Sequence, residues 1–425
     1  MGSGENQMPI IWRILAAVVL CAYILRGLLP SLPDETDWER RAAAPVVATM
    51  IQPPSSMYSI SRQLEGQLST ESLSMFNENL RRFTARMHQA GSDSEVGATL
   101  SEVAKLMMAP VAVATAQQRL QLVQEIVAQC AEPHVIKQGH HNTCAIAALE
   151  SRLYTRSPSV PARIVAQVAI AGRFGLRDGM MITVPQRALQ PDAEAQLYSP
   201  RNERRTYASQ LFQIAGANAY WQSRTEDPRG IKVPLGSISY LQYSAPDENA
   251  DDTGERLVIN RPDGSKENVL ASDGKIDYSP SFGLSQILDL NSLLSAERDQ
   301  DFIVAASATG GDSRILQVHS ISSLRQTLAK LAKGGHLPVI LSVNLNSGVF
   351  GADQVRARDG HADWHAVNVS DYDASTATVT IDNWWSDRLP LRNYNTLSVA
   401  DLFPAMCDRA PASVAASNDE PESTM

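Results

Sequence analysis

Cysteine is scarce in this chain of 425 residues. There are four cysteines, Cys21, Cys130, Cys144 and Cys407, and they are scattered without paired spacing. This pattern excludes a disulfide framework and a four-thiolate zinc site, both of which need closely spaced pairs. It does not decide the redox compartment.

Long basic stretches are also lacking. The formal net charge is -9, and no run of Lys or Arg is long enough to bind a phosphate backbone. We therefore expect no nucleic-acid partner. Hydrophobic residues make up 44% of the chain, which is ample for a packed core. The length allows two or three domains, or one large domain with extensions.

The N-terminal segment, residues 1–33, has only a short uninterrupted apolar run. That run, Ile14–Leu25, is 12 residues long. If Arg13 and Arg26 snorkel at its ends, Ile10–Leu29 reaches the roughly 20 residues that span a bilayer. We favour a single membrane anchor of undecided orientation. A cleaved secretion signal, with a secreted protein, and an interfacial helix are the alternatives.

Three further segments flank the region that carries the chemistry. Residues 34–56 are proline-rich and predict a linker, and residues 409–425 have the composition of a disordered tail. Residues 57–132 predict helices, because apolar residues recur there at steps of three and four. We interpret this helical region as a subdomain packed on the next unit, or alternatively as an inhibitory segment. The clearest stripe is Leu73, Phe76, Leu80, Phe83 and Met87.

Residues 133–408 predict a mixed α+β catalytic domain. Its first helix should start at Cys144 with Thr143 as N-cap. Residues 225–315 change character and contain a hairpin pattern, which we interpret as an insertion. Further helices are expected at Pro161–Phe174, Tyr207–Trp221 and Ser320–Lys333, and strands at Arg256–Asn260, Asn268–Leu270, Pro338–Val343, Ala366–Tyr372 and Thr376–Ile381.

Cys144 is the candidate nucleophile. A thiol that opens a helix faces unpaired backbone N–H groups and the helix dipole, which should lower its pKa. Gln138 lies six residues earlier. The turn Gly139–Thr143 can fold the Gln138 amide back beside the cysteine. Its NH₂ and the Cys144 N–H would then form an oxyanion hole.

His365 is the candidate general base and acid. It starts a predicted core strand, which would hold the imidazole rigidly. A later residue must orient the ring and favour its cation. Asn383 and Asp382 both suit that role, each lying two residues before one of the tryptophans Trp384 and Trp385. Spacing leaves both open, with a slight preference for Asn383.

Other histidines are given a non-catalytic interpretation. His361 and His365 are four residues apart, but the segment lacks the glutamate of a zinc-hydrolase helix and precedes a strand pattern. We therefore expect no metal or other cofactor. His140 and His141, close to Cys144, are expected to line the substrate cleft or to face solvent.

These motifs together resemble the papain-like cysteine peptidases. The order of Cys144, His365 and Asn383 or Asp382 is similar, as is the Gln-Gly segment at Gln138. The resemblance extends to bacteriocin-processing and bacterial effector members, whose orienting residue is an Asp. It implies a helical lobe, an antiparallel β lobe and hydrolysis of peptide bonds in a protein or peptide substrate.

The chain also departs from that family's pattern. Ala145 stands where papain has an aromatic residue, and the local papain signature around the cysteine is absent. The long separation of Cys144 from His365 requires an insertion. Two alternative functions stay open: a transglutaminase or glutamine deamidase on the same fold, and a non-catalytic, membrane-tethered interaction protein. The oligomeric state is also open.

Overall fold

The structure is a computed structural model that describes part of the chain. The described residues all lie in a compact unit that spans Pro53–Met425. The predicted anchor at 1–33, nearly all of the linker and the tail at 409–425 lie outside them. Among the described helices, none combines the length and apolar character needed to cross a membrane. The described ranges are 55–139, 141–192, 194–195, 204–242, 255–270, 282–295, 302–306, 312–344, 347–350, 364–384 and 396–407.

Four helices occupy the region predicted to be helical, and most of the predicted apolar stripe is buried in α4. The Thr115 side chain begins α6 through a capping box with Gln118. The Arg86 guanidinium of α4 donates hydrogen bonds to the carbonyls of Cys130 and Thr155. These bonds join the region to the helices that follow. The four are α3 (Ser55–Leu64), α4 (Thr70–Gln89), α5 (Asp93–Met108) and α6 (Ala116–Ala131).

Among the described residues of the central part of the chain, three helices pack around α9, whose residues are all buried. A helix predicted at Pro161–Phe174 ends earlier than expected. Gly172 adopts φ 67°, which terminates the helix, and a strand follows. The helices are α7 (Cys144–Arg156), α8 (Ser159–Ala171), α9 (Tyr207–Gln222) and α10 (Leu284–Leu294); the short hairpin is β1 (Arg173–Gly175) with β2 (Met181–Thr183). Short 3-10 turns cover Pro133–Val135, Gln186–Leu189 and Gly348–Phe350.

A six-stranded sheet has the order β11-β10-β9-β8-β6-β7. Strands β8 to β11 pair antiparallel, whereas β6 pairs parallel with both β7 and β8. The expectation of an antiparallel β lobe is therefore wrong for this edge, because α11 makes the crossover that joins β7 to β8. The elements are β6 (Ile303–Ala306), β7 (Leu316–Val318), α11 (Ile321–Lys333), β8 (Val339–Asn344), β9 (Trp364–Asp373), β10 (Thr378–Asp382), β11 (Thr396–Ser398) and α12 (Val399–Ala405).

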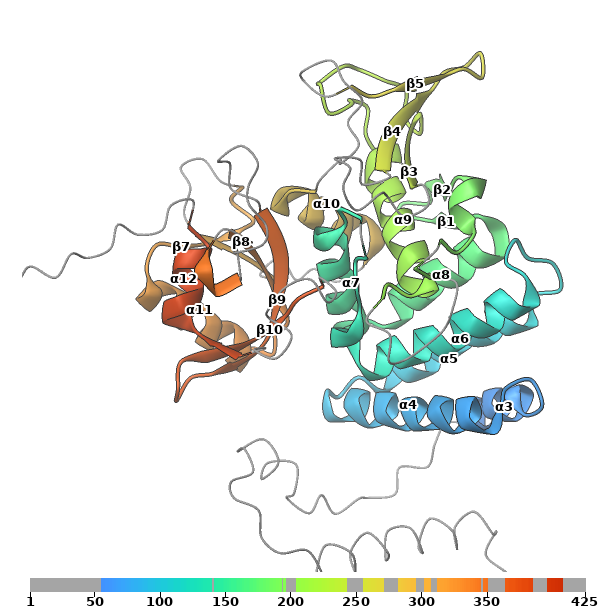
Figure 1. Cartoon of the computed structure of the whole chain (residues 1–425), viewed down its shortest axis with the longest axis horizontal. Helices are drawn as coiled ribbons and strands as arrows, with labels where there is room; N and C mark the ends of the chain where they lie inside the picture. The colour runs from blue at the N-terminus through green and yellow to red at the C-terminus, as the bar shows by residue number, and fades with distance from the viewer. Residues whose placement is uncertain are drawn as a thin grey trace, which may run out of the picture. The chain divides into compact units, whose positions relative to one another are not determined.

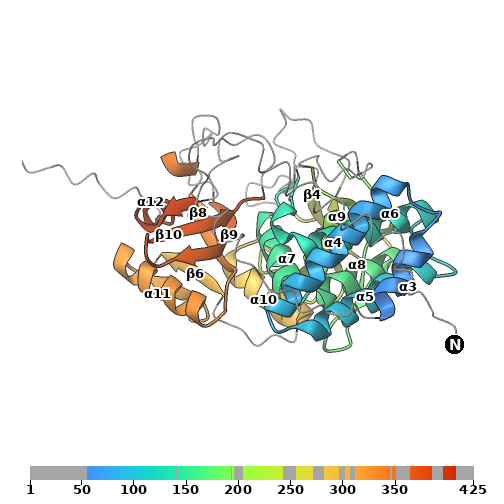
Figure 2. The same ribbon diagram turned by 90° about the horizontal axis from the view of Figure 1, so that it is seen from below.

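The two faces of β9 enter different cores, because side chains alternate along a strand. Ala366 joins the helical core, and the Asn368 side chain donates to the carbonyl of Ala148 in α7 at 3.0 Å. Val367 and Val369 pack instead with α11 and α12. Figures 1 and 2 both show α7 beside β9. The sheet and the nucleophile helix are thus joined at this strand.

The first part of the predicted insertion forms a separate three-stranded sheet, and the hairpin expected there is present. Its strands are β3 (Ile238–Gln242), β4 (Glu255–Asn260) and β5 (Lys266–Asn268), all antiparallel. The predicted insertion extends too far, because its last part contributes α10 and the strand β6 of the six-stranded sheet. Asn218 of α9 donates to the carbonyl of Tyr240 at 3.0 Å and accepts from its N–H at 3.1 Å. This amide fixes β3 on α9, at the top of Figure 1.

Candidate active site

Cys144 is the first residue of α7, as predicted, and its sulfur lies against β9. The backbone N–H of Ala366 in β9 lies close enough to the thiol to lower the pKa of Cys144, against the larger effect of burial, which raises it. Ala366 directly follows His365 in β9. The structure therefore places the Cys144 thiol beside the residue that follows His365 in β9.

The His365 ring is held by Asn383. His365 is 1% exposed, and its Nε2 lies 2.8 Å from Asn383 Oδ1. An amide oxygen only accepts, so Nε2 carries the proton and Nδ1 carries the lone pair of a neutral ring. Burial lowers the pKa of His365 to about 4, although the Asn383 bond opposes this shift. At neutral pH the imidazole is a base.

Asp382 has a different environment from Asn383. Its Oδ1 accepts from the hydroxyl of Ser370 at 3.1 Å. Burial raises the pKa of Asp382 to about 6, while nearby His134 and the Ser370 bond act in the opposite direction. The pairing of β9 with β10 shifts register between Thr380 and Ile381. Of the two candidates that spacing could not separate, the structure places Asn383 at the ring.

Trp384 connects the histidine strand to the segment before the nucleophile. Its side chain is fully buried, and its carbonyl accepts from the backbone N–H of Gln138 at 3.2 Å. Trp385 and His361 lie outside the described residues, as does His140.

Gln138 is buried, and its amide folds back into the turn before Cys144. The Gln138 NH₂ donates to the carbonyl of His141 at 3.0 Å. An amide NH₂ has two donors, so one remains for a ligand. Gly139 has φ 70°, and a Cβ there would meet the Glu194 carboxylate at 2.1 Å. Only glycine fits this position without moving Glu194.

The Cys144 pKa is shifted in the direction opposite to that expected. Burial raises it, and the charge of Glu255 acts the same way. The N–H groups of Ala366 and Ala145 lower it, but by less. The N–H groups do favour the thiolate, as expected at the start of a helix, but the cost of burying its charge is larger. The Cys144 thiol and the His365 imidazole are therefore both neutral at neutral pH.

Two other local expectations are corrected. Thr143 occupies the N-cap position, but its hydroxyl makes no capping bond and instead donates to Gln213 Oε1 at 2.7 Å. His141 was expected in the cleft or in solvent. It is 1% exposed, and its Nε2 lies 3.5 Å from Asp192 Oδ2. Both side chains anchor the turn to the helical core.

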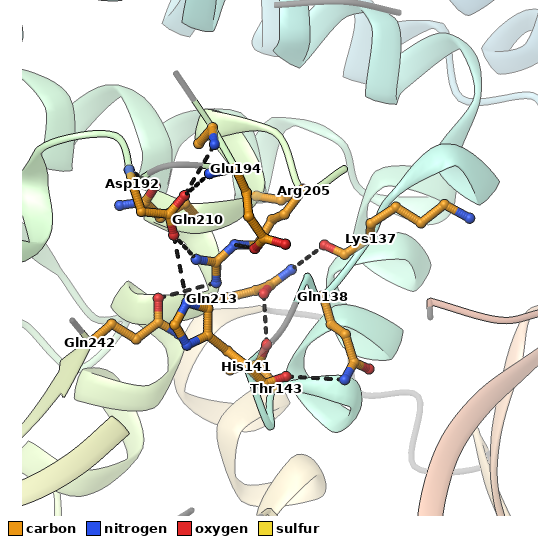
Figure 3. A network of polar contacts seen from close by, with 12 residues as sticks. Lys137, Gln138, His141, Thr143, Asp192, Glu194, Arg205, Gln210, Gln213 and Gln242 are labelled. Atoms are coloured by element: carbon orange, nitrogen blue, oxygen red, sulfur yellow. Dashed lines mark hydrogen bonds and ion pairs between the residues drawn. The ribbon is translucent and has the colours of Figure 1, made fainter. Parts of the chain in front are cut away.

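A buried charge network around Arg205 was missed at the sequence level (Figure 3). The guanidinium binds Asp192, lies 3.8 Å from Glu194 and donates to Gln242 Oε1 at 3.1 Å. Burial alone would raise the pKa of Asp192, but Arg205 and His141 hold it well below its usual range. His141, Asp192 and Glu194 could offer ligand atoms within 4.8 Å of one another. The positive charge that faces the carboxylates of Asp192 and Glu194 is already provided by the Arg205 guanidinium.

Glu255 brings the inserted sheet into the site and was also missed. Its Oε2 accepts from the backbone N–H of Asn142 at 2.9 Å, and its Oε1 binds the Tyr240 hydroxyl. Gln242 donates to that hydroxyl at 2.9 Å. The only sequence signal was an acidic residue directly before a buried strand pattern.

Comparison with known protein families, with characterised proteins and with solved structures finds no match to this chain. The functional argument therefore rests on the geometry of Cys144, His365 and Asn383.

Proposed function

We propose that this protein is a cysteine peptidase with a papain-like fold, acting on a protein or peptide substrate. The observation that carries the proposal is the bond of 2.8 Å between His365 Nε2 and Asn383 Oδ1. His365 directly precedes Ala366, whose backbone N–H faces the Cys144 thiol. A thiol, a base and a group that orients the base are the parts that thiol acyl transfer requires.

The fold is compatible with this proposal. The nucleophile is the first residue of α7, the base lies in β9, and its orienting residue directly follows the neighbouring antiparallel strand β10. The papain resemblance implies this distribution between a helical part and a sheet. The parallel strands β6 and β7 and the sheet β3–β5 are additions to it.

The reaction starts from the neutral pair. His365 Nδ1 accepts the thiol proton as Cys144 Sγ attacks the substrate carbonyl carbon. The resulting oxyanion is bound by N–H groups of the Gln138 amide and the Cys144 backbone. Collapse breaks the C–N bond, and the imidazolium protonates the leaving amine. Water, deprotonated by His365, then hydrolyses the thioester. Asn383 holds Nε2–H throughout.

The alternatives draw less support from the site. A transglutaminase or glutamine deamidase would use the same thiol on a side-chain amide, and an aspartate at the ring would favour it. Asn383 at the ring favours peptide hydrolysis. A non-catalytic, membrane-tethered interaction protein would be favoured by a Cys144 remote from His365, whereas its thiol faces the backbone N–H of Ala366, the residue after His365. Attachment to a membrane through residues 1–33 stays a proposal.

A peptide library analysed by mass spectrometry tests the proposed function. The wild-type protein should cleave peptide bonds, and Cys144→Ala and His365→Ala should abolish cleavage. Conversion of glutamine to glutamate in uncleaved peptides would support the deamidase instead. If the wild type changes no peptide, and Cys144 reacts with iodoacetamide no faster than the buried Cys130, the enzymatic proposals fail.

A further inference from the structure

Gln213 closes the loop that carries both the oxyanion donor and the nucleophile. It lies on α9, its side chain is fully buried, and its amide makes three hydrogen bonds, of which those to Lys137 and Thr143 are drawn in Figure 3. Its Nε2 donates to the carbonyl of Lys137 at 3.0 Å and to Glu150 Oε2 at 3.0 Å. Its Oε1 accepts from the Thr143 hydroxyl at 2.7 Å.

The contacts of Gln213 with Lys137 and Thr143 lie next to the two residues that would form the oxyanion hole. Lys137 immediately precedes Gln138, and Thr143 immediately precedes Cys144. A single amide group therefore spans both ends of the turn. Gln213 is 76 residues from Lys137 and 70 from Thr143, so the constraint comes from outside the loop.

The amide can hold the loop in only one orientation. The Lys137 carbonyl only accepts hydrogen bonds, so a reversed Gln213 amide would set two oxygens against each other. Glu150 is fully buried behind the amide, and its other oxygen accepts from Ser209 at 2.8 Å. These contacts fix which end of Gln213 faces Lys137 and which faces Thr143.

We propose that Gln213 is a positioning residue that sets the Gln138 amide against the Cys144 backbone N–H and so builds the oxyanion hole. The inference rests on the proposed function and deepens it. Gln213 does not touch the substrate and acts through Lys137 and Thr143. Its loss should impair the stabilisation of a tetrahedral oxyanion, while the reactivity of the thiol should change little.

The chain offers a matched control on the same helix. Gln222 is also buried in α9, and its amide clamps both backbone groups of Thr183, accepting at 3.1 Å and donating at 2.7 Å. It makes a similar structural contribution but holds strand β2. Gln222→Met therefore reports the cost of removing a buried amide clamp away from the site.

The test compares Gln213→Met with Gln222→Met, using a peptide that the wild type cleaves. Loss of one oxyanion donor costs about 100-fold or more in kcat, so Gln213→Met should lower kcat by about 30- to 100-fold, with KM within about threefold. Alkylation of Cys144 by iodoacetamide forms no oxyanion and should stay within about threefold of wild type. Gln222→Met should change kcat by no more than about twofold, because it acts on stability alone.

A second pair of variants serves if Gln213→Met does not fold. Thr143→Val removes one end of the clamp with little change of shape and should lower kcat, whereas Thr143→Ser keeps the hydroxyl and should restore it. If both clamp variants retain the kcat of the Gln222→Met protein, the positioning role is overturned while the peptidase stands. If alkylation of wild-type Cys144 ignores His365 and no peptide is cleaved, the proposed function falls, and this inference with it.

Discussion

His365 lies in β9 and Asn383 directly follows the neighbouring strand β10, and the histidine Nε2 is 2.8 Å from the amide oxygen of the asparagine. The bond assigns the proton to Nε2 and leaves Nδ1 as the base. Because both residues are held by the sheet, the ring orientation is set before any substrate binds.

Asn383→Ala should therefore lower kcat more than KM. The ring would lose its acceptor, so the wrong tautomer would become populated, and we expect a loss of about 10- to 100-fold in kcat. Steady-state kinetics on a cleaved peptide measure this loss. Ser370→Ala, which removes the hydrogen bonds of that hydroxyl to Asp382 and to the carbonyl of Thr380 but none to Asn383, is the control and should leave kcat nearly unchanged. Equal losses in the two variants would argue against a role for Asn383.

The pH profile of kcat/KM should have its acid limb near pH 4. Burial lowers the pKa of His365 to about 4, so the base form persists to that pH and is lost below it. Activity should therefore rise through pH 4 and stay high at neutral pH. Burial raises the pKa of Asp382 to about 6, but this carboxyl is not the base. Asp382→Asn should therefore leave the acid limb of the kcat/KM profile near pH 4. A wild-type limb near pH 6 that moves in Asp382→Asn would contradict this assignment.

Glu150 should make the fold less stable as pH rises. Burial raises its pKa to about 8, whereas bonds from Gln213 and Ser209 lower it by less. The folded state then keeps a proton that the unfolded chain releases above its usual pKa. The stabilisation is complete below about pH 4.5 and disappears progressively up to about pH 8.

Urea unfolding of Glu150→Gln at several pH values tests this. Relative to the variant, the wild type should lose roughly 1 kcal/mol of unfolding free energy per pH unit across that window. Glu71→Gln, at an exposed position of α4, should run parallel to the wild type. Parallel curves for Glu150→Gln and the wild type would show that Glu150 is ionised in the folded protein.

Gly139→Ala should destabilise the turn before the nucleophile. Gly139 has φ 70°, and the new Cβ would meet the Glu194 carboxylate. Gly264 has φ 83° but open space around its Cβ position, so Gly264→Ala isolates the backbone strain. That strain costs about 1 kcal/mol, and Gly139→Ala should cost measurably more in thermal unfolding. Equal costs would mean that Glu194 moves aside freely.

Local patterns in the sequence were sufficient to locate the elements of the site. The helix that starts at Cys144 was predicted from Thr143 as its N-cap, and the strand that carries His365 from its alternating pattern, and both elements are present. The preference for Asn383 could not be firm, because a shift of register between β9 and β10 decides which residue meets the ring. Such a shift leaves no signature in spacing.

Burial and long-range contacts were beyond the sequence. The pKa of Cys144 rises because desolvation outweighs the nearby N–H groups, and desolvation depends on the whole fold. Gln213 lies on a helix predicted almost to the residue, yet nothing in that helix shows that it binds Thr143. Glu255 reaches the site only because the inserted sheet folds back on α9.

The central claim is that His365 activates Cys144, and the rate of Cys144 alkylation by iodoacetamide at neutral pH tests it most directly. Mass spectrometry of labelled peptides separates Cys144 from Cys130 and Cys407. The account predicts that Cys144 reacts faster than both and that His365→Ala slows it by at least tenfold, in line with the usual contribution of a general base. A Cys144 that reacts no faster than Cys407, at a rate unchanged in His365→Ala, would contradict it.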